Sequence, residues 1–149
     1  MKAEPKLVET APGHSGPAGP ALFADPWNPS SSEIRAWAYA HDAHEPCQDW
    51  DLALAWAGHE RDYLEFSADA NCPNRLYFLH VIYLMVGDAV RNDYQTTPKA
   101  VVQGFVERAA NTRCQSLRRW RERSLHLLAH PSEFDYTAWC GGGYSRAEI

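Results

Sequence analysis

The stretch RLYFLHVIYLMVGDAVRND, residues 75–93, is the most apolar part of this 149-residue chain. Ten of the eleven residues from 76 to 86 are apolar, and His80 is the exception. A helix that crosses a bilayer needs about 20 apolar residues in succession, and this run meets Gly87 and Asp88 well before that length. Because the run is apolar on nearly every side, it predicts a central core helix rather than a membrane span.

The flanking segments carry helical signals. A serine at 30–32 with Glu33 close behind is typical of a capped helix start, and Pro98 suits a first helical position. Segment 47–71 has apolar residues at helical spacing and predicts one long helix, or two divided near Gly58. The sequence therefore predicts an all-α fold, a compact bundle of five or six helices with short connections.

The ends of the chain differ in composition from its middle. Residues 1–29 hold six of the ten prolines, and such a segment buries too little apolar surface to fold by itself. We therefore expect a disordered tail at 1–29, a single helical domain at 30–140 and a flexible tail at 141–149, which begins with three glycines. The last apolar side chains of the first tail can still dock on the folded body: Leu22, Phe23 and Trp27.

Four cysteines stand far apart, and no CxxC pair occurs, so a zinc-binding cysteine cluster is not supported. The N-terminal residues lack the apolar core of a signal peptide. These two observations predict a reducing, cytoplasmic location with free thiols that are buried as small apolar side chains.

Charge is unevenly distributed along a chain of net charge −5. Residues 42–69 hold eight acids and one arginine, whereas residues 108–123 hold six arginines and one acid. The two segments either face each other or one of them faces a partner. Binding to nucleic acid is not expected, because Trp120 falls on the apolar side of the arginine-rich helix and the rest of the chain is acidic.

Two groups of histidines raise the question of a metal. His126 and His130 are one helical turn apart, a spacing that can hold zinc, but neither a third ligand nor a metalloprotease motif accompanies them. A second group lies within seven residues at a helix end: His41, His44, Glu45 and Cys47. Solvated polar surfaces explain both groups, so the prediction is that there is no metal and no cofactor.

No nucleophile elbow, phosphate-binding loop or dinucleotide fingerprint occurs. One polar constellation remains on the apolar run, where His80, Asp88 and Arg91 share a helix sector of about 80°. It indicates either a polar pocket of a small helical enzyme or ligand-binding protein, or a surface ion pair of Asp88 with Arg91 beside a hydrogen-bonded core histidine. The second interpretation is favoured, because ion pairs are costly to bury.

The acidic helix QDWDLALAW leads to the preferred functional hypothesis. Leu52 and Trp56 lie away from its main apolar face, and aromatic anchors among charges are typical of partner surfaces. We therefore expect a non-catalytic interaction protein that binds a basic protein, similar in size and charge to bacterial immunity or antitoxin proteins. The alternative places Trp56 in the core. The predicted partner-binding residues are Asp49, Asp51, Leu52, Trp56 and Asp62.

Overall fold

The structure is a computed structural model that describes residues 23–148. Eight α-helices and one short 3-10 helix occur in this part of the chain, and no strand occurs there, which confirms the all-α prediction. In chain order they are α1 (Ser31–Ala38), α2 (Trp50–Ala57), α3 (Glu60–Ala68), α4 (Arg75–Arg91), α5 (Lys99–Glu107), α6 (Gln115–Ala129), η1 (Pro131–Glu133), α7 (Tyr136–Trp139) and α8 (Gly143–Arg146). The predicted disorder of the first tail falls mostly on residues 1–22, which lie outside the described residues.

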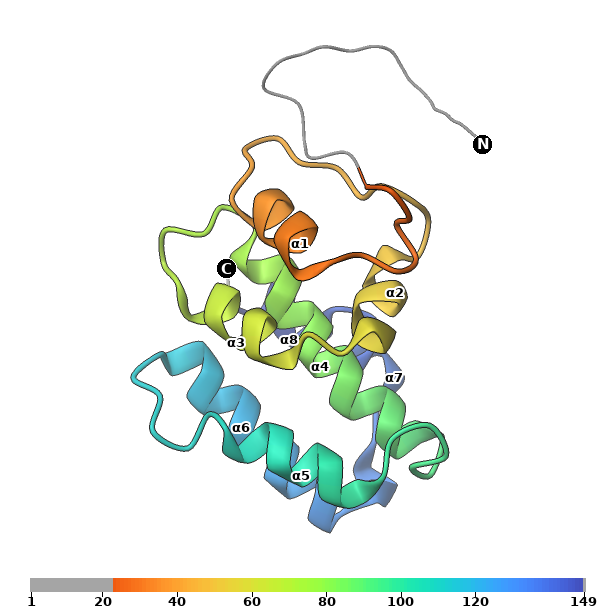
Figure 1. Cartoon of the computed structure of the whole chain (residues 1–149). Helices are drawn as coiled ribbons and strands as arrows, with labels where there is room; N and C mark the ends of the chain where they lie inside the picture. Colours follow the sequence, from red (N-terminus) through yellow and green to blue (C-terminus); the bar gives the residue numbers. More distant parts are fainter. Residues whose placement is uncertain (1–22, 149) are drawn as a thin grey trace.

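Helix α4, formed by the apolar run, crosses the middle of the fold (Figure 1). Ten of its 17 residues are buried, and α2, α3, α5, α6, α7 and α8 all pack against it. The predicted central core helix is thus confirmed. None of the helices in residues 23–148 combines the length and the apolar character needed to cross a bilayer.

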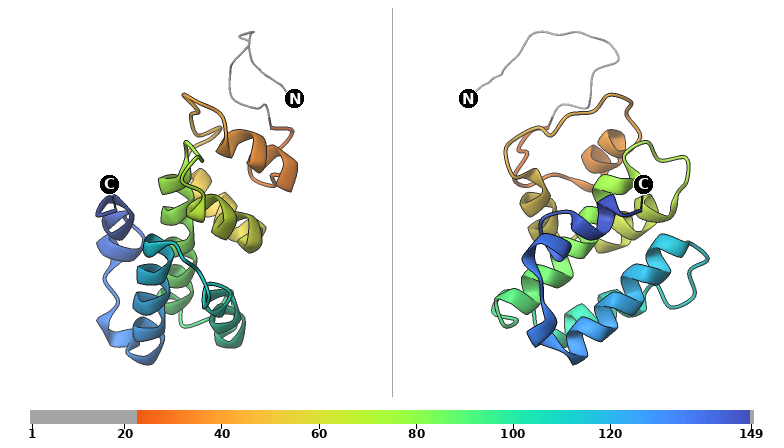
Figure 2. Two further views of the ribbon diagram at one scale, coloured as in Figure 1. Left: turned by 90° about the vertical axis from the view of Figure 1, so that its left-hand side faces the viewer. Right: turned by 180° about the vertical axis from the view of Figure 1, so that it is seen from behind.

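The other helices surround α4 on three sides. Helices α1–α3 pack on one side of α4, α6 runs alongside α4 with α5 beside it, and α7 with α8 lie on the side of α4 opposite α3 (Figure 2). Aromatic rings fill the first contact, where Trp37 packs edge-on against Trp50 and Phe78. At the second, the buried Trp120 of α6 donates its indole N–H to the Ile82 carbonyl of α4 at 3.1 Å.

Specific residues end and join the helices. Gly58 divides segment 47–71 into α2 and α3, because its φ of +79° lies in the left-handed region that glycine adopts without strain. The Asn74 amide, just before α4, donates to the carbonyls of Trp37, Ala38 and Ala40. It therefore satisfies carbonyl groups left open where α1 ends and ties α1 to α4.

Residues on both sides of the predicted range 30–140 pack on the helices. On the N-terminal side, Phe23 packs edge-on against Trp50, and the Pro26 carbonyl accepts the Trp50 indole N–H at 2.9 Å. On the C-terminal side, the predicted flexible tail instead forms α8, which packs on α4. Gly87 permits the close approach of α7 to α4, because a Cβ there would lie 2.7 Å from the Trp139 Cβ. Apolar contacts thus hold residues on both sides of the range 30–140 against the helices.

Candidate functional site

An exposed pair of tryptophans marks one face of the molecule. Trp56, near the end of α2, is 64% exposed, and Trp27 beside it is 47% exposed. The two ring centroids lie 6.0 Å apart. Trp56 is thus on the surface, because the inward side of α2 is already occupied by Trp50, Ala53 and Leu54.

Trp56 forms one wall of a groove of about 220 Å³ between α2, α4 and α5. The apolar part of the lining comes from all three helices: Ala55, Trp56, Met85, Ala89, Val101, Val102 and Phe105. Glu60 and Asp88 add carboxylates, and Thr96 and Thr97 add hydroxyl groups. A groove of this kind suits a partner segment in which an apolar side chain lies next to a positively charged one.

The structure spreads the other predicted partner-binding residues over different surroundings. Asp49 is exposed before α2, whereas Leu52 is half-buried against the core. Asp51 forms a hydrogen bond with His80, and neither residue lines the Trp56 groove. Asp62 accepts a hydrogen bond from the Ser31 hydroxyl at 2.6 Å and lies 3.5 Å from Arg35. Tertiary contacts therefore engage two of the three predicted carboxylates, Asp51 and Asp62, and leave Asp49 exposed.

His80 lies in a second cleft, of about 420 Å³, between α4 and the C-terminal segment. Its Nε2 is 2.8 Å from the Asp51 carboxylate, and this hydrogen bond holds the pKa of Asp51 below its usual range. Its Nδ1 is buried and has no hydrogen-bond partner within the described chain. A neutral imidazole that donates from Nε2 to Asp51 fits both atoms, since Nδ1 then carries only a lone pair.

Cys140 forms part of the wall of the same cleft. Burial raises the pKa of its thiol to about 11, so the thiol is protonated near neutral pH. A nucleophilic cysteine needs a lowered pKa, because the thiolate is the reactive form. The cysteine in this cleft is therefore not prepared for covalent catalysis.

Asp88 and Arg91 do not join His80. Asp88 pairs with Arg91 three residues further along α4 at 2.5 Å, and Asp88 faces the Trp56 groove. The Arg91 guanidinium lies over the Tyr136 ring, 5.6 Å from its centroid. A single pocket of His80, Asp88 and Arg91 is therefore not formed, and the ion pair expected between Asp88 and Arg91 is present. Eight residues along a helix separate His80 from Asp88 by about 12 Å in rise, which explains the difference.

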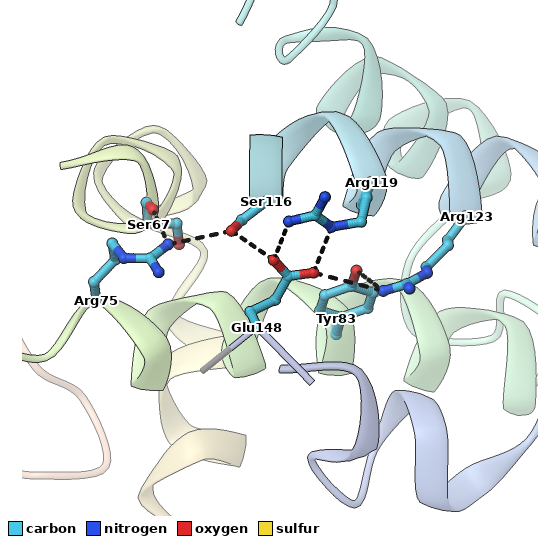
Figure 3. A network of polar contacts seen from close by, with 7 residues as sticks. All are labelled: Ser67, Arg75, Tyr83, Ser116, Arg119, Arg123 and Glu148. Carbon is cyan, nitrogen blue, oxygen red and sulfur yellow. Dashed lines mark hydrogen bonds and ion pairs between the residues drawn. The ribbon is translucent and has the colours of Figure 1, made fainter. Parts of the chain in front are cut away.

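The arginines of the basic helix α6 contact partners within the fold, two of them around Glu148 (Figure 3). The side chain of Glu148 is 3% exposed and accepts hydrogen bonds from Arg119 Nε at 2.7 Å and from the Ser116 hydroxyl at 2.8 Å. Arg123 lies 4.0 Å from the same carboxylate and donates to the Tyr83 hydroxyl at 2.9 Å. These contacts lower the pKa of Glu148, with the Arg119 hydrogen bond first among the causes.

The arginines of α6 therefore do not neutralise the acidic segment 42–69. Arg121 pairs with Glu107 of α5, and Arg118 donates to the Thr112 carbonyl. No sequence signal pointed to Glu148, because a lone glutamate near a chain end has no periodicity and its partners lie about 30 residues away.

The histidine groups also separate. Within residues 23–148, one set of three metal-ligating side chains comes together, namely His126, His130 and Glu133. The group at 41–47 forms no such set, and Glu45 instead accepts a hydrogen bond from the Tyr77 hydroxyl.

Comparisons with known protein families, with curated proteins and with solved structures found no match to this chain. Its function must therefore be inferred from its own geometry.

Proposed function

We propose that this chain is a non-catalytic interaction protein that binds a basic partner protein at the Trp56 groove. The observation that carries the proposal is the exposed pair Trp27–Trp56 at the edge of an apolar groove. A tryptophan can bury roughly 150–250 Å² on binding, and tryptophans are enriched among the residues that dominate interface energies. Exposed apolar patches rimmed by polar residues mark sites where proteins contact partners.

The chemistry of the groove favours a positively charged partner segment. The chain has a net charge of −5, and the acidic segment 42–69 contributes α2 and α3 beside the groove. Glu60, in the groove lining, has no ion-pair partner among residues 23–148. An apolar side chain in the groove, with lysine or arginine next to it, would satisfy both the rings and this carboxylate.

The proposed class of protein rests on the size and charge of the chain and on its free thiols. Bacterial immunity and antitoxin proteins include small acidic helical proteins that neutralise a basic protein, and we propose this class by analogy. A cytoplasmic location is part of the proposal and is supported by the four free cysteines.

Trp56→Ala tests the groove. A pull-down from a lysate of the native cells should yield a partner with the wild-type chain, and the purified partner should then bind Trp56→Ala about 30-fold more weakly, which corresponds to loss of a hot spot of about 2 kcal/mol. Tyr136→Ala is the matched control, because Tyr136 is an exposed aromatic residue outside the groove lining. It should bind as wild type does, in calorimetric titrations.

A partner that binds Trp56→Ala as tightly as wild type would refute the groove as the binding site. Glu60→Lys tests the charge in the same titrations. It should slow association, with a larger effect at low salt than at high salt, because steering between charges is screened by ions. An acidic partner would contradict the proposed complementarity.

Ligand binding in the His80 cleft is the second candidate, and the buried, unpartnered Nδ1 beside a cleft of about 420 Å³ favours it. A bound small molecule should give the purified protein a higher mass under native than under denaturing conditions in mass spectrometry. His80→Gln should lose that added mass, whereas Asp88→Asn, outside this cleft, should keep it. Equal native and denatured masses for the wild-type chain would count against this candidate.

A further inference from the structure

Three side chains at the end of α6 form a cluster with metal-binding chemistry. His126 and His130 occupy the last turn and the end of the helix, and Glu133 follows in η1 after Pro131. One ligand atom from each of the three lies within 4.8 Å of the others. The imidazole rings are stacked, with centroids 4.4 Å apart. All three side chains are exposed, so an ion from solution can reach them.

Hydrogen bonding fixes the tautomer of the second imidazole. His130 Nδ1 lies 3.1 Å from the His126 carbonyl oxygen, which can only accept. The Nδ1 atom must therefore carry the proton, and the Nε2 lone pair of a neutral His130 remains available. Donation of one ring N–H to a backbone carbonyl is how proteins fix the tautomer of a metal-binding histidine.

The first imidazole and the carboxylate already lie at a suitable separation. His126 Nε2 and Glu133 Oε1 are 2.9 Å apart. Two ligand atoms that each lie about 2.1 Å from a tetrahedral metal are about 3.4 Å from each other. The two atoms therefore need to move apart by only about 0.5 Å to hold an ion. On binding, a neutral His126 places its proton on Nδ1 and turns the Nε2 lone pair to the ion.

The surroundings are compatible with a cation. The last carbonyl groups of a helix carry partial negative charge, which favours positive ions near its end. The nearest arginine along the helix is Arg123, one turn earlier, and it is held by other groups. Its guanidinium lies 4.1 Å from the Tyr144 ring centroid and donates to the Tyr83 hydroxyl.

We propose that His126, His130 and Glu133 bind one divalent ion of the zinc class, with the fourth position open to solvent. Two imidazoles and one carboxylate are ligands that zinc, copper and nickel prefer, whereas magnesium prefers oxygen ligands and water. The fixed His130 tautomer distinguishes this cluster from two histidines that share a helix face by chance. The site is independent of the Trp56 groove and of the proposed function.

The test uses the untagged full-length chain, stripped with a chelator and titrated with zinc chloride in a calorimeter. The wild-type chain should bind one zinc ion at this site. His126→Ala and His130→Ala should each weaken that binding by at least about tenfold. The double variant His41→Ala/His44→Ala is the matched control, because it removes two histidines outside the cluster, and it should bind as wild type does. Any binding of zinc by the cysteine thiols would contribute equally to the titrations of all variants, since the cysteines are unchanged.

Thermal unfolding supplies a second measurement. Saturating zinc should raise the melting temperature of the wild-type chain and of the control, but not that of His130→Ala, because an ion that binds only the folded state stabilises it. Copper or nickel should displace zinc in competition, and magnesium should not. Equal zinc affinity in wild type and His126→Ala/His130→Ala, with both folded by circular dichroism, would overturn the site, as would the absence of saturable binding to wild type.

Discussion

Trp50→Ala should lower the free energy of unfolding by about 3–5 kcal/mol, the usual range for removal of a buried tryptophan. Trp50 is 0% exposed and packs between Phe23 and Trp37. Its indole N–H also donates to the Pro26 carbonyl. Alanine would leave a large cavity in the core and would remove the contacts that hold residues 23–27 on the domain.

Trp56→Ala is the matched comparison, because it changes the same residue type on the same helix. We expect a loss of only about 0.5–1.5 kcal/mol, the usual contribution of one aromatic pair, here the contact with Trp27. Urea unfolding followed by circular dichroism measures both values. A loss for Trp56→Ala as large as that for Trp50→Ala would mean that Trp56 supports the core, and the interaction proposal would lose its anchor.

The fold class could be predicted from the sequence because its signals are local. The apolar run of residues 76–86 and the periodicity of its neighbours depend on residues within a few turns of each other. Gly58 and Pro98 mark helix boundaries for the same reason. The short helices α7 and α8 have weaker signals, since four residues show no clear period. Helix α8 was missed, since residues 141–149 were expected to form a flexible tail.

The candidate sites were less predictable because they depend on tertiary contacts. Asp51 and His80 are 29 positions apart, and nothing in the local pattern indicates that they pair. Asp88 and Arg91, three positions apart, form the pair that helical spacing suggests. The exposure of Trp56 could only be stated as one of two alternatives, because periodicity shows that a helix has a second apolar side but not whether another helix covers it.

Glu148→Gln should lower the free energy of unfolding at neutral pH by about 1–3 kcal/mol. Breaking a buried ion pair typically costs about 3–5 kcal/mol, but Arg119 is 44% exposed, so water compensates part of the loss. The carboxylate is nonetheless buried, and it accepts hydrogen bonds from both Arg119 and Ser116 (Figure 3). The amide keeps the shape of the side chain, but it loses the charge and one acceptor oxygen.

The matched control is Glu107→Gln, which removes a more exposed carboxylate from its pair with Arg121. An exposed pair contributes about 0–1 kcal/mol, so the control should change stability little. Equal small losses for both variants would mean that the C-terminal segment separates readily from α6. A large loss for Glu148→Gln alone would show that this segment belongs to the cooperative fold.

The effect of Glu148 should also depend on pH in a defined direction. Its pKa in the folded state lies below the usual value of 4.5, because the Arg119 hydrogen bond favours the ionised form. The stabilisation is therefore complete above about pH 4.5 and is lost as the pH falls through the lower folded-state value. Protonation of other carboxylates with lowered pKa values, such as those of Asp51 and Glu65, also destabilises the fold in acid. The difference between wild type and Glu148→Gln isolates one group. Measured by urea unfolding, that difference should be constant from pH 7 to pH 5 and should shrink below pH 4; a difference that grows in acid would contradict the ionised, arginine-bound carboxylate.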